Sequence, residues 1–151
     1  MADIPPNSST GAALGRRGER AARDFLQNAG YRILCQNWLA PHQRGELDLV
    51  CQDSQGTLCF VEVKTRRTAS LLPEERPRPL KAVTATKEER VRRAASDYLR
   101  ALGNPPVPCR FDVVEVWADG KGRPCLLRHW PDLLPGRPRF LLRQWRGEAR
   151  P

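Results

Sequence analysis

Apolar positions recur along this chain at two spacings, and each spacing is typical of one kind of secondary structure. Residues 10–29 and 82–102 carry apolar side chains at helical spacing, which predicts two helices. Gly15 and Gly18 lower the helix propensity of the first turns, so the first helix is predicted to become regular only near Arg17. Alternating or continuous apolar runs predict five strands, at Tyr31–Trp38, Glu46–Cys51, Thr57–Lys64, Arg110–Trp117 and Pro124–Trp130.

The predicted order is α-β-β-β-α-β-β, which is typical of a single α/β domain with a mixed central sheet flanked by helices. Residues 1–9 are polar and contain prolines, so we expect a disordered leader before a domain that spans residues 10–130. Residues 65–81 contain prolines and several charges, which predicts a long mobile loop. Residues 131–151 form a basic tail rich in Arg and Pro.

The net charge of the chain is distributed unevenly along the sequence, and this distribution is more informative than the total. The 151 residues include 26 Lys+Arg and 17 Asp+Glu, a net charge of +9 that favours a polyanionic partner. Most basic residues are Arg, a bias that a GC-rich genome also produces. Residues 1–63 carry a net charge of −1, whereas 64–93 and 120–151 each carry +6. The acidic first part therefore calls for a chemical explanation.

Several classes of protein are excluded by missing signals. The N-terminal region has no basic start followed by an apolar run, and no apolar stretch is long enough to span a bilayer, so we expect no membrane association. The 5 cysteines include no Cys-x-x-Cys pair, which favours reduced thiols in the cytoplasm. His42 and His129 lack the spacing of a zinc site, and no nucleotide-binding glycine motif is present.

Charged side chains interrupt the apolar strands of the predicted hairpin at residues 46–64. Because alternate residues of a strand share a face, strand pairing would bring Asp48 alongside Glu62, with Lys64 one step further. Two carboxylates among apolar neighbours repel each other unless a cation lies between them, and such oxygen ligands suit Mg²⁺ or Mn²⁺. Glu19 shares the apolar face of the first predicted helix and would supply a third carboxylate.

A site of this kind would bind a scissile phosphate and activate water, while Lys64 orients or deprotonates the water or neutralises developing charge. The Asp-x13-Glu-x-Lys spacing alone is a weak signal, because Glu-x-Lys pairs also occur on solvated strand faces. Likewise, Glu19 alone is also typical of a solvated helix position. The combination of apolar flanking strands, three convergent acids and a basic remainder favours the metal site.

Several stretches across residues 15–117 resemble the YraN-like family of bacterial proteins. In order, they are Gly18-Glu19-Arg20-Ala21-Ala22, Gly30-Tyr31-Arg32-Ile33-Leu34, Asn37, Gly45-Glu46-Leu47-Asp48-Leu49-Val50, Phe60-Val61-Glu62-Val63-Lys64-Thr65-Arg66, Lys87-x-x-Arg90 and Arg110-Phe111-Asp112-Val113-Val114. That family is a branch of the PD-(D/E)xK nuclease superfamily and is similar to archaeal Holliday junction resolvases. The resemblance implies a restriction-endonuclease-like fold.

The resemblance also implies roles for individual residues. Asp48, Glu62 and Lys64 match the metal-binding and catalytic positions of the superfamily. Glu19 matches the helix-borne acid of the resolvase-like branch, and the carbonyl of Val63 would join the metal shell. The Pro-rich segment 67–81 and the Arg-rich tail depart from the family pattern, so the resemblance leaves the preferred substrate open.

Basic residues near the acids are candidates for contacts with phosphates, although an ordinary solvent-exposed surface explains them equally well. These candidates are Arg44, Arg66, Arg67, Lys87 and Arg90. Lys87 and Arg90, with Arg93, recur at three-residue steps and predict a basic stripe on the second helix.

The leading hypothesis is a Mg²⁺- or Mn²⁺-dependent endonuclease acting on DNA, with branched or repair intermediates as substrates. A two-fold symmetric junction would favour a homodimer. The first alternative is a non-catalytic nucleic-acid-binding module of nuclease-like fold. The second alternative is an adaptor that captures a protein partner through its C-terminal tail.

Overall fold

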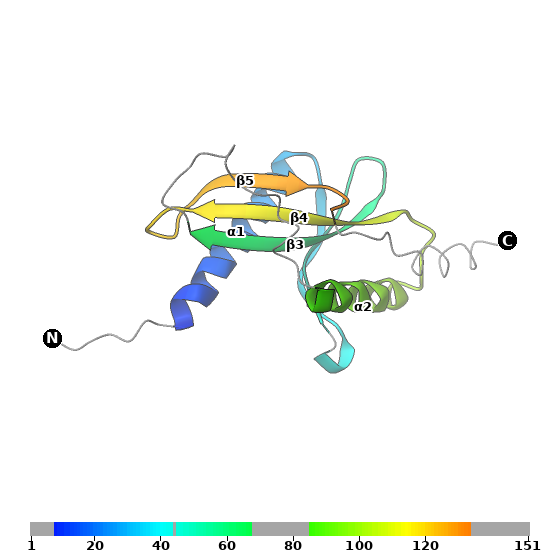
Figure 1. The fold of residues 1–151 in the computed structure, drawn as a ribbon. Helices are drawn as coiled ribbons and strands as arrows, with labels where there is room; N and C mark the ends of the chain where they lie inside the picture. The colour runs from blue at the N-terminus through cyan, green and yellow to red at the C-terminus, as the bar shows by residue number, and fades with distance from the viewer. Residues whose placement is uncertain (1–7, 44, 68–84, 134–151) are drawn as a thin grey trace.

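The fold is built around a central strand whose two neighbours run in opposite senses. The computed structural model describes residues 8–43, 45–67 and 85–133 (Figure 1). Its elements are α1 (Ser8–Asn28), β1 (Arg32–Leu39), the short 3₁₀ helix η1 (Pro41–Gln43), β2 (Glu46–Gln52), β3 (Leu58–Arg67), α2 (Ala85–Ala101), β4 (Cys109–Ala118) and β5 (Pro124–Trp130). The predicted α-β-β-β-α-β-β order is confirmed.

The five strands form one mixed sheet in the order β1-β2-β3-β4-β5. β3 is antiparallel to β2 but parallel to β4, and the other neighbouring pairs are antiparallel. Two parallel strands need a long crossover connection, and α2 lies in that connection between β3 and β4. The predicted mixed sheet is therefore confirmed, with its parallel pair at the centre.

Each helix packs on its own face of the sheet, so the structure has three layers (Figure 1). In one core, Val91 and Tyr98 of α2 pack with Phe60 of β3. In the other core, Ala22 of α1 packs with Val61, the next residue of β3. Neighbouring strand residues thus enter opposite layers, as the two-residue repeat of a β-strand requires. Residues that alternate with Phe60 consequently face the α2 layer.

Two boundaries differ from the sequence-based expectation. α1 begins at Ser8, not near Arg17, and takes in two residues assigned to the leader. Packing of the helix on the sheet outweighs the low helix propensity of its glycines. β3 continues through Arg67, so the expected loop cannot begin at residue 65, because Thr65–Arg67 pair with β4. Residues 1–7, 68–84 and 134–151, which hold the rest of the leader, loop and tail, lie outside the described residues.

The five cysteines of the chain all lie within the described residues. All five cysteines are free thiols, and Cys51 and Cys59 are cross-strand neighbours on β2 and β3. Within the described residues, neither helix is long and apolar enough to cross a membrane.

The closest approach of α1 to β3 depends on Gly18, which is buried. A Cβ atom added to Gly18 would lie 1.8 Å from Oγ1 and 2.8 Å from Cβ of Thr65. The helix backbone therefore lies directly on the side chain of Thr65, and Gly18 contributes no side chain of its own to the gap. This contact positions Glu19, the next residue of α1, beside the end of the sheet that carries the predicted acids.

We expect Gly18→Ala to destabilise the fold by about 1–3 kcal/mol, because α1 must move away from Thr65 to relieve the overlap. Gly15→Ala is the matched control, since an added Cβ at Gly15 meets nothing within 4 Å. The control is expected to be neutral or slightly stabilising. Urea unfolding of both variants measures the difference, and equal effects would contradict the close contact.

Candidate functional site

The predicted acid pair lies where β2 and β3 begin to diverge. The last paired residues of these strands include Leu49 and Val61, so the next positions along each strand are Asp48 and Glu62. Asp48 is only 7% exposed and Glu62 only 3% exposed. The backbone N–H of Val63 donates a 2.8 Å hydrogen bond to Oδ2 of Asp48. This bond spans the gap between the strands and holds the Asp48 carboxylate against β3.

Two lysines from different elements converge on a single oxygen of Glu62. Lys87 Nζ, from the first turn of α2, lies 2.5 Å from Oε1 of Glu62. Lys64 Nζ lies 3.9 Å from the same oxygen. Within the described part of the chain, this buried oxygen makes no hydrogen bond of normal geometry. Its charge is therefore balanced by the two ammonium groups, which approach from strand and helix.

Burial and like charges change the pKa values of these groups. Burial, and then the nearby charge of Asp48, raise the pKa of Glu62 to about 7, although Lys87 partly opposes the rise. Burial lowers the pKa of Lys64, and the adjacent charge of Lys87 lowers it further. Burial acts in the same direction on Lys87, but the interaction with Glu62 outweighs it and raises its pKa. The two lysines thus have opposite tendencies to release a proton.

Glu19 reaches the edge of this site from the opposite helix. Its pKa is raised, first by burial and then by the charge of Asp48, and a side-chain hydrogen bond with Asn37 lowers it in part. Asn37 lies on β1 between the residues that pair with Leu47 and Leu49, which brackets Asp48. Asn37 has a left-handed φ of 50°, a conformation that Asn tolerates better than most residues.

Asn37 was not predicted as a site residue. The sequence feature that could have identified it is a polar, turn-forming residue inside a run of strand-forming residues. In the structure this residue lies directly opposite the acidic position of β2. The structure assigns it the role of a hydrogen-bond partner for Glu19.

The described residues contain no group of three or more His, Cys, Asp or Glu side chains arranged to hold a metal ion. Asp48 and Glu62 nevertheless offer two carboxylates of the kind that Mg²⁺ and Mn²⁺ prefer, and Oε1 of Glu62 is held by ion pairs without a hydrogen bond of normal geometry. The donor set therefore fits a divalent cation, with the ammonium group of Lys87 lying against one of its ligands.

The predicted nucleic-acid contacts are distributed over different parts of the molecule. Arg66 and Arg67 are exposed at the end of β3, and Arg90 is exposed on α2. Lys87 is turned toward Glu62 rather than standing in a surface stripe, and Arg93 forms an ion pair with Glu89. The predicted stripe on α2 is therefore interrupted. Arg44 lies outside the described residues.

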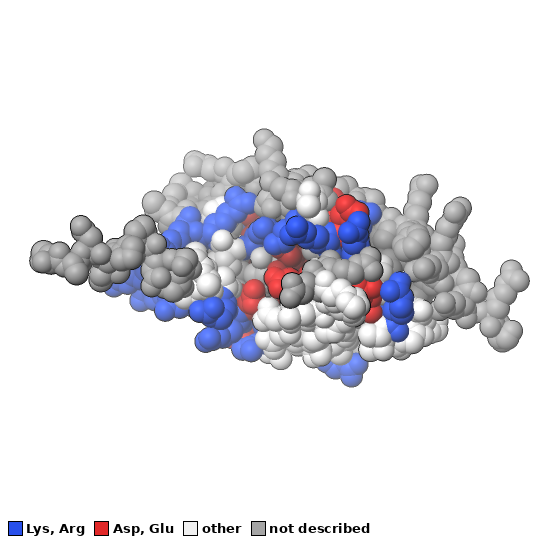
Figure 2. Space-filling model, turned by 90° about the horizontal axis from the view of Figure 1, so that it is seen from below, with Lys and Arg blue, Asp and Glu red and all other residues white. Residues whose placement is uncertain are grey.

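On the surface, acidic side chains lie near the middle of the face seen from below, with Lys and Arg on both sides of them (Figure 2). On this face the acidic centre therefore lies between groups of basic side chains, and a patch of uncharged side chains adjoins it (Figure 2).

Residues 18–116, which include the acid pair and Lys87, match the family described as "Uncharacterised protein family UPF0102". The chain belongs to this family. A UPF0102 protein of Symbiobacterium thermophilum is 49% identical over 110 residues, which cover 73% of this chain and 86% of the relative. A UPF0102 protein of Chlorobium phaeobacteroides is 44% identical over 120 residues, which cover 77% and 89%. The YraN-like resemblance is thus confirmed at the level of the family.

A similar match extends to a third bacterial relative. A UPF0102 protein of Nocardia farcinica is 43% identical over 114 residues, covering 76% of this chain and 84% of the relative.

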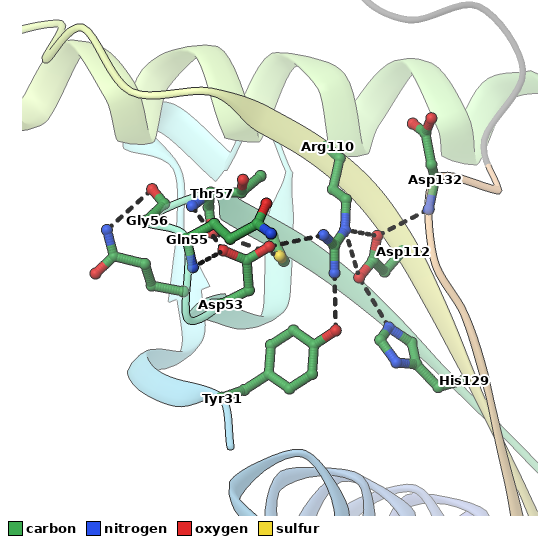
Figure 3. A network of polar contacts seen from close by, with 11 residues as sticks. Tyr31, Asp53, Gln55, Gly56, Thr57, Arg110, Asp112, His129 and Asp132 are labelled. Atoms are coloured by element: carbon green, nitrogen blue, oxygen red, sulfur yellow. Dashed lines mark hydrogen bonds and ion pairs between the residues drawn. The ribbon is translucent and has the colours of Figure 1, made fainter. Parts of the chain in front are cut away.

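A second polar network lies on the α1 face of the sheet (Figure 3). Asp112 on β4 is fully buried and accepts hydrogen bonds from Arg110 at 3.0 Å and from the backbone of Asp132 at 2.9 Å; it also contacts His129 Nε2 at 2.8 Å. Arg110 additionally binds Asp53 and the hydroxyl of Tyr31, each at 2.9 Å. Burial acts to raise the pKa of Asp112, but these partners lower it overall.

The pairs within this network connect β4 to β5, to the β2–β3 turn and to the start of β1. Sequence reasoning missed it, because its members are far apart in the chain and come together only through the strand register. Its oxygens are already occupied by protein donors, so it serves the fold rather than a ligand.

The raised pKa of Glu62 predicts a specific pH dependence of stability. Since the folded protein binds this proton more tightly than the unfolded chain, the free energy of unfolding falls as pH rises from about 4.5 to about 7. The slope from this one group approaches about 1.4 kcal/mol per pH unit. Glu62→Gln removes this contribution, so its stability relative to wild type should increase across that window.

Urea unfolding at a series of pH values measures this difference. Glu89→Gln is the control, because Glu89 is exposed on α2, and its curve should run parallel to that of the wild type. A Glu62→Gln curve that also ran parallel to the wild type would show that Glu62 has an ordinary pKa.

Proposed function

We propose that this protein is a divalent-metal-dependent nuclease of restriction-endonuclease-like fold that hydrolyses phosphodiester bonds in DNA. The observation that carries the proposal is the buried Asp48–Glu62 pair with two lysines at Oε1 of Glu62. Buried acids lower the stability of a fold unless they are paired. Two buried acids side by side therefore indicate a functional role that offsets this loss of stability. The mixed sheet with α2 as its crossover agrees with the proposed fold.

Asp48 and Glu62 would hold Mg²⁺ or Mn²⁺, with the carbonyl of Val63 as a further ligand and Glu19 beside them. When bound, the cation supplies positive charge that stabilises the transition state and promotes ionisation of water. The hydrogen bond from Val63 N–H keeps the Asp48 carboxylate in place before any ligand arrives. This preorganisation lowers the cost of assembling the site.

Lys64 is the chain's own candidate for moving a proton. It is half-buried, and its lowered pKa makes the neutral amine more accessible than in an exposed lysine. In that form its Nζ would accept a proton from the attacking water, and in the charged form it would orient the water and balance charge on the phosphate. Lys87, which holds its proton more firmly, would remain a fixed positive charge.

Branched DNA and repair intermediates are the proposed substrates, and a two-fold symmetric junction would be cleaved by a homodimer. Lys and Arg on both sides of the acidic centre suit a polyanion, and phosphate contacts position a nucleic acid without reading its sequence (Figure 2).

A second candidate function is a non-catalytic nucleic-acid-binding module of the same fold. The observation that favours it is the ion pair between Lys87 and Glu62, which already supplies a cation to the acid pair. In that case the acids stabilise the fold, and the protein binds nucleic acid without cleaving it.

Cleavage assays distinguish the two functions. In Mn²⁺ or Mg²⁺, wild-type protein should cleave at least one of supercoiled plasmid, linear duplex and four-way junction DNA, and EDTA should stop the reaction. Asp48→Asn, Glu62→Gln and Lys64→Met should each lower the rate by about 100-fold or more, as expected for loss of a charged active-site group. Asp24→Asn, an exposed acid of α1, is the control and should leave cleavage unchanged.

Cleavage that survives Asp48→Asn or EDTA would overturn the proposed site. Salt-dependent DNA and RNA binding without cleavage of any form would instead support the binding module.

Metal binding can be tested without any substrate. Because Lys87 lies against a proposed ligand, its positive charge opposes a cation at Glu62. Lys87→Met should therefore bind Mn²⁺ several-fold more tightly than the wild type in isothermal titration calorimetry, while Asp48→Asn should bind it more weakly. Arg93→Met, on an exposed part of the same helix, is the control. Equal Mn²⁺ affinity of wild type and Lys87→Met would place the cation elsewhere.

A further inference from the structure

Exposed cations from three elements meet at one end of the molecule. Arg17 belongs to α1, Arg66 and Arg67 to the last residues of β3, and Lys121 to the turn between β4 and β5. We call these four residues the basic end surface. Basic side chains extend toward the left of the face in Figure 2, and Figure 1 places the β4–β5 connection at that end.

The turn between β4 and β5 brings these cations together. Arg17 Nη1 donates to the carbonyl oxygens of Lys121 at 3.3 Å and of Gly122 at 3.5 Å. Gly122 has a φ of 76°, and a Cβ added there would lie 3.3 Å from Arg17 Nη1 and 3.7 Å from Arg67 Nη2. The guanidinium groups of α1 and β3 therefore lie over the same small residue. Arg66 is placed over the ring of Trp117, 5.8 Å from its centroid.

Across residues 8–43, 45–67 and 85–133, none of the four cations has an ion pair with an acidic side chain. Three of the four arginines of α2 differ, because Arg92, Arg93 and Arg100 are each paired with an acid on the same helix. Neighbouring positive charges repel each other, and an anion placed between them relieves the repulsion. The basic end surface thus carries uncompensated positive charge, whereas three of the four arginines of α2 are neutralised.

We propose that the basic end surface binds the phosphate backbone of the nucleic acid on one side of the scissile bond. This inference rests on the proposed function for its choice of nucleic acid. β3 carries residues of both sites, since Arg66 shares the face of Lys64 at the end of the strand. Arg67, on the other face, is about 10 Å from Lys64 along the strand. In a duplex, about 10 Å along the axis corresponds to about three phosphates of one strand. The backbone therefore runs from the acid pair toward the β4–β5 turn and away from α2.

The contacts available here are to phosphates rather than to bases. The cations lie at the end of a strand, on the side of a helix and in a turn. This surface presents no helix that could enter a groove of DNA. Such contacts fix the path of a backbone without sequence preference, which suits selection of DNA by shape.

The test measures binding of a fluorescein-labelled DNA duplex in EDTA by fluorescence anisotropy, at several salt concentrations. The triple variant Arg17→Gln/Arg67→Gln/Lys121→Gln should bind more weakly, and the slope of log affinity against log salt should decrease by about 0.9 for each lost contact. The control triple Arg92→Gln/Arg93→Gln/Arg100→Gln removes the same charge from α2 and should retain the wild-type slope. Equal losses from both triples, or wild-type binding by the first, would overturn the proposal.

Two further measurements keep the outcome interpretable. If the first triple is less stable, Arg67→Gln/Lys121→Gln leaves the hydrogen bonds of Arg17 in place and is compared with Arg93→Gln/Arg100→Gln. Vesicles containing phosphatidylserine test the other anionic partner, and variants that lose vesicle binding but keep DNA binding would overturn the proposal. DNA binding that depends on this surface, in a protein that cleaves no DNA, would contradict the nuclease function alone.

Discussion

The buried charge of Glu62 is the constraint on which the arrangement of the molecule depends. A carboxylate that is 3% exposed needs positive partners, because it has lost almost all contact with water. Lys64 approaches it along the same strand, and Lys87 approaches it from α2. The second contact ties the crossover helix to the central strand, so the same interaction that balances the acid also orients α2 on the sheet.

The fold and the centre of the candidate site follow from patterns that are local in the sequence. Periodicity predicted both helices, all five strands and their order, and strand alternation placed Asp48 next to Glu62. The orientation of Lys87 toward Glu62 was harder to predict, because its spacing from Arg90 and Arg93 suggested an exposed stripe. Which side of a helix turns inward depends on how Val91 and its apolar neighbours pack on the sheet, and that packing is a property of the folded molecule.

The remaining features depend on long-range register and on backbone conformation. The contact between Asp112 and His129 exists only because β4 and β5 pair with one particular register. The start of α1 was misplaced because helix propensity describes an isolated helix, whereas Gly18 serves the contact with Thr65. The proposed nuclease-like fold and the proposed roles of the acids rest on family resemblance combined with chemistry, since an Asp-x13-Glu-x-Lys spacing alone is weak.

Neighbouring positions of the central strand pair carry two polar systems with opposite character. Glu62 lies beside Val113 in the β3–β4 register and faces the α2 layer, while Asp112 lies beside Val61 and faces the α1 layer. Both oxygens of Asp112 are held by protein donors, but Oε1 of Glu62 has ion pairs without a well-formed hydrogen bond. The first arrangement is complete without a ligand and reinforces the fold. The second leaves a buried carboxylate oxygen that is held by ion pairs alone.

The contact of Gly18 with Thr65 has a mechanical consequence for the site. Where two long side chains separate two elements, the spacing can adjust through changes of rotamer, but here only the short, β-branched side chain of Thr65 separates the helix backbone from β3. Glu19 and Arg17 flank that contact on α1, and Lys64 and Arg66 flank it on β3. This contact therefore helps to set the separation between the acidic centre and the basic end surface. A nucleic acid that binds both in the proposed way would have to match this spacing.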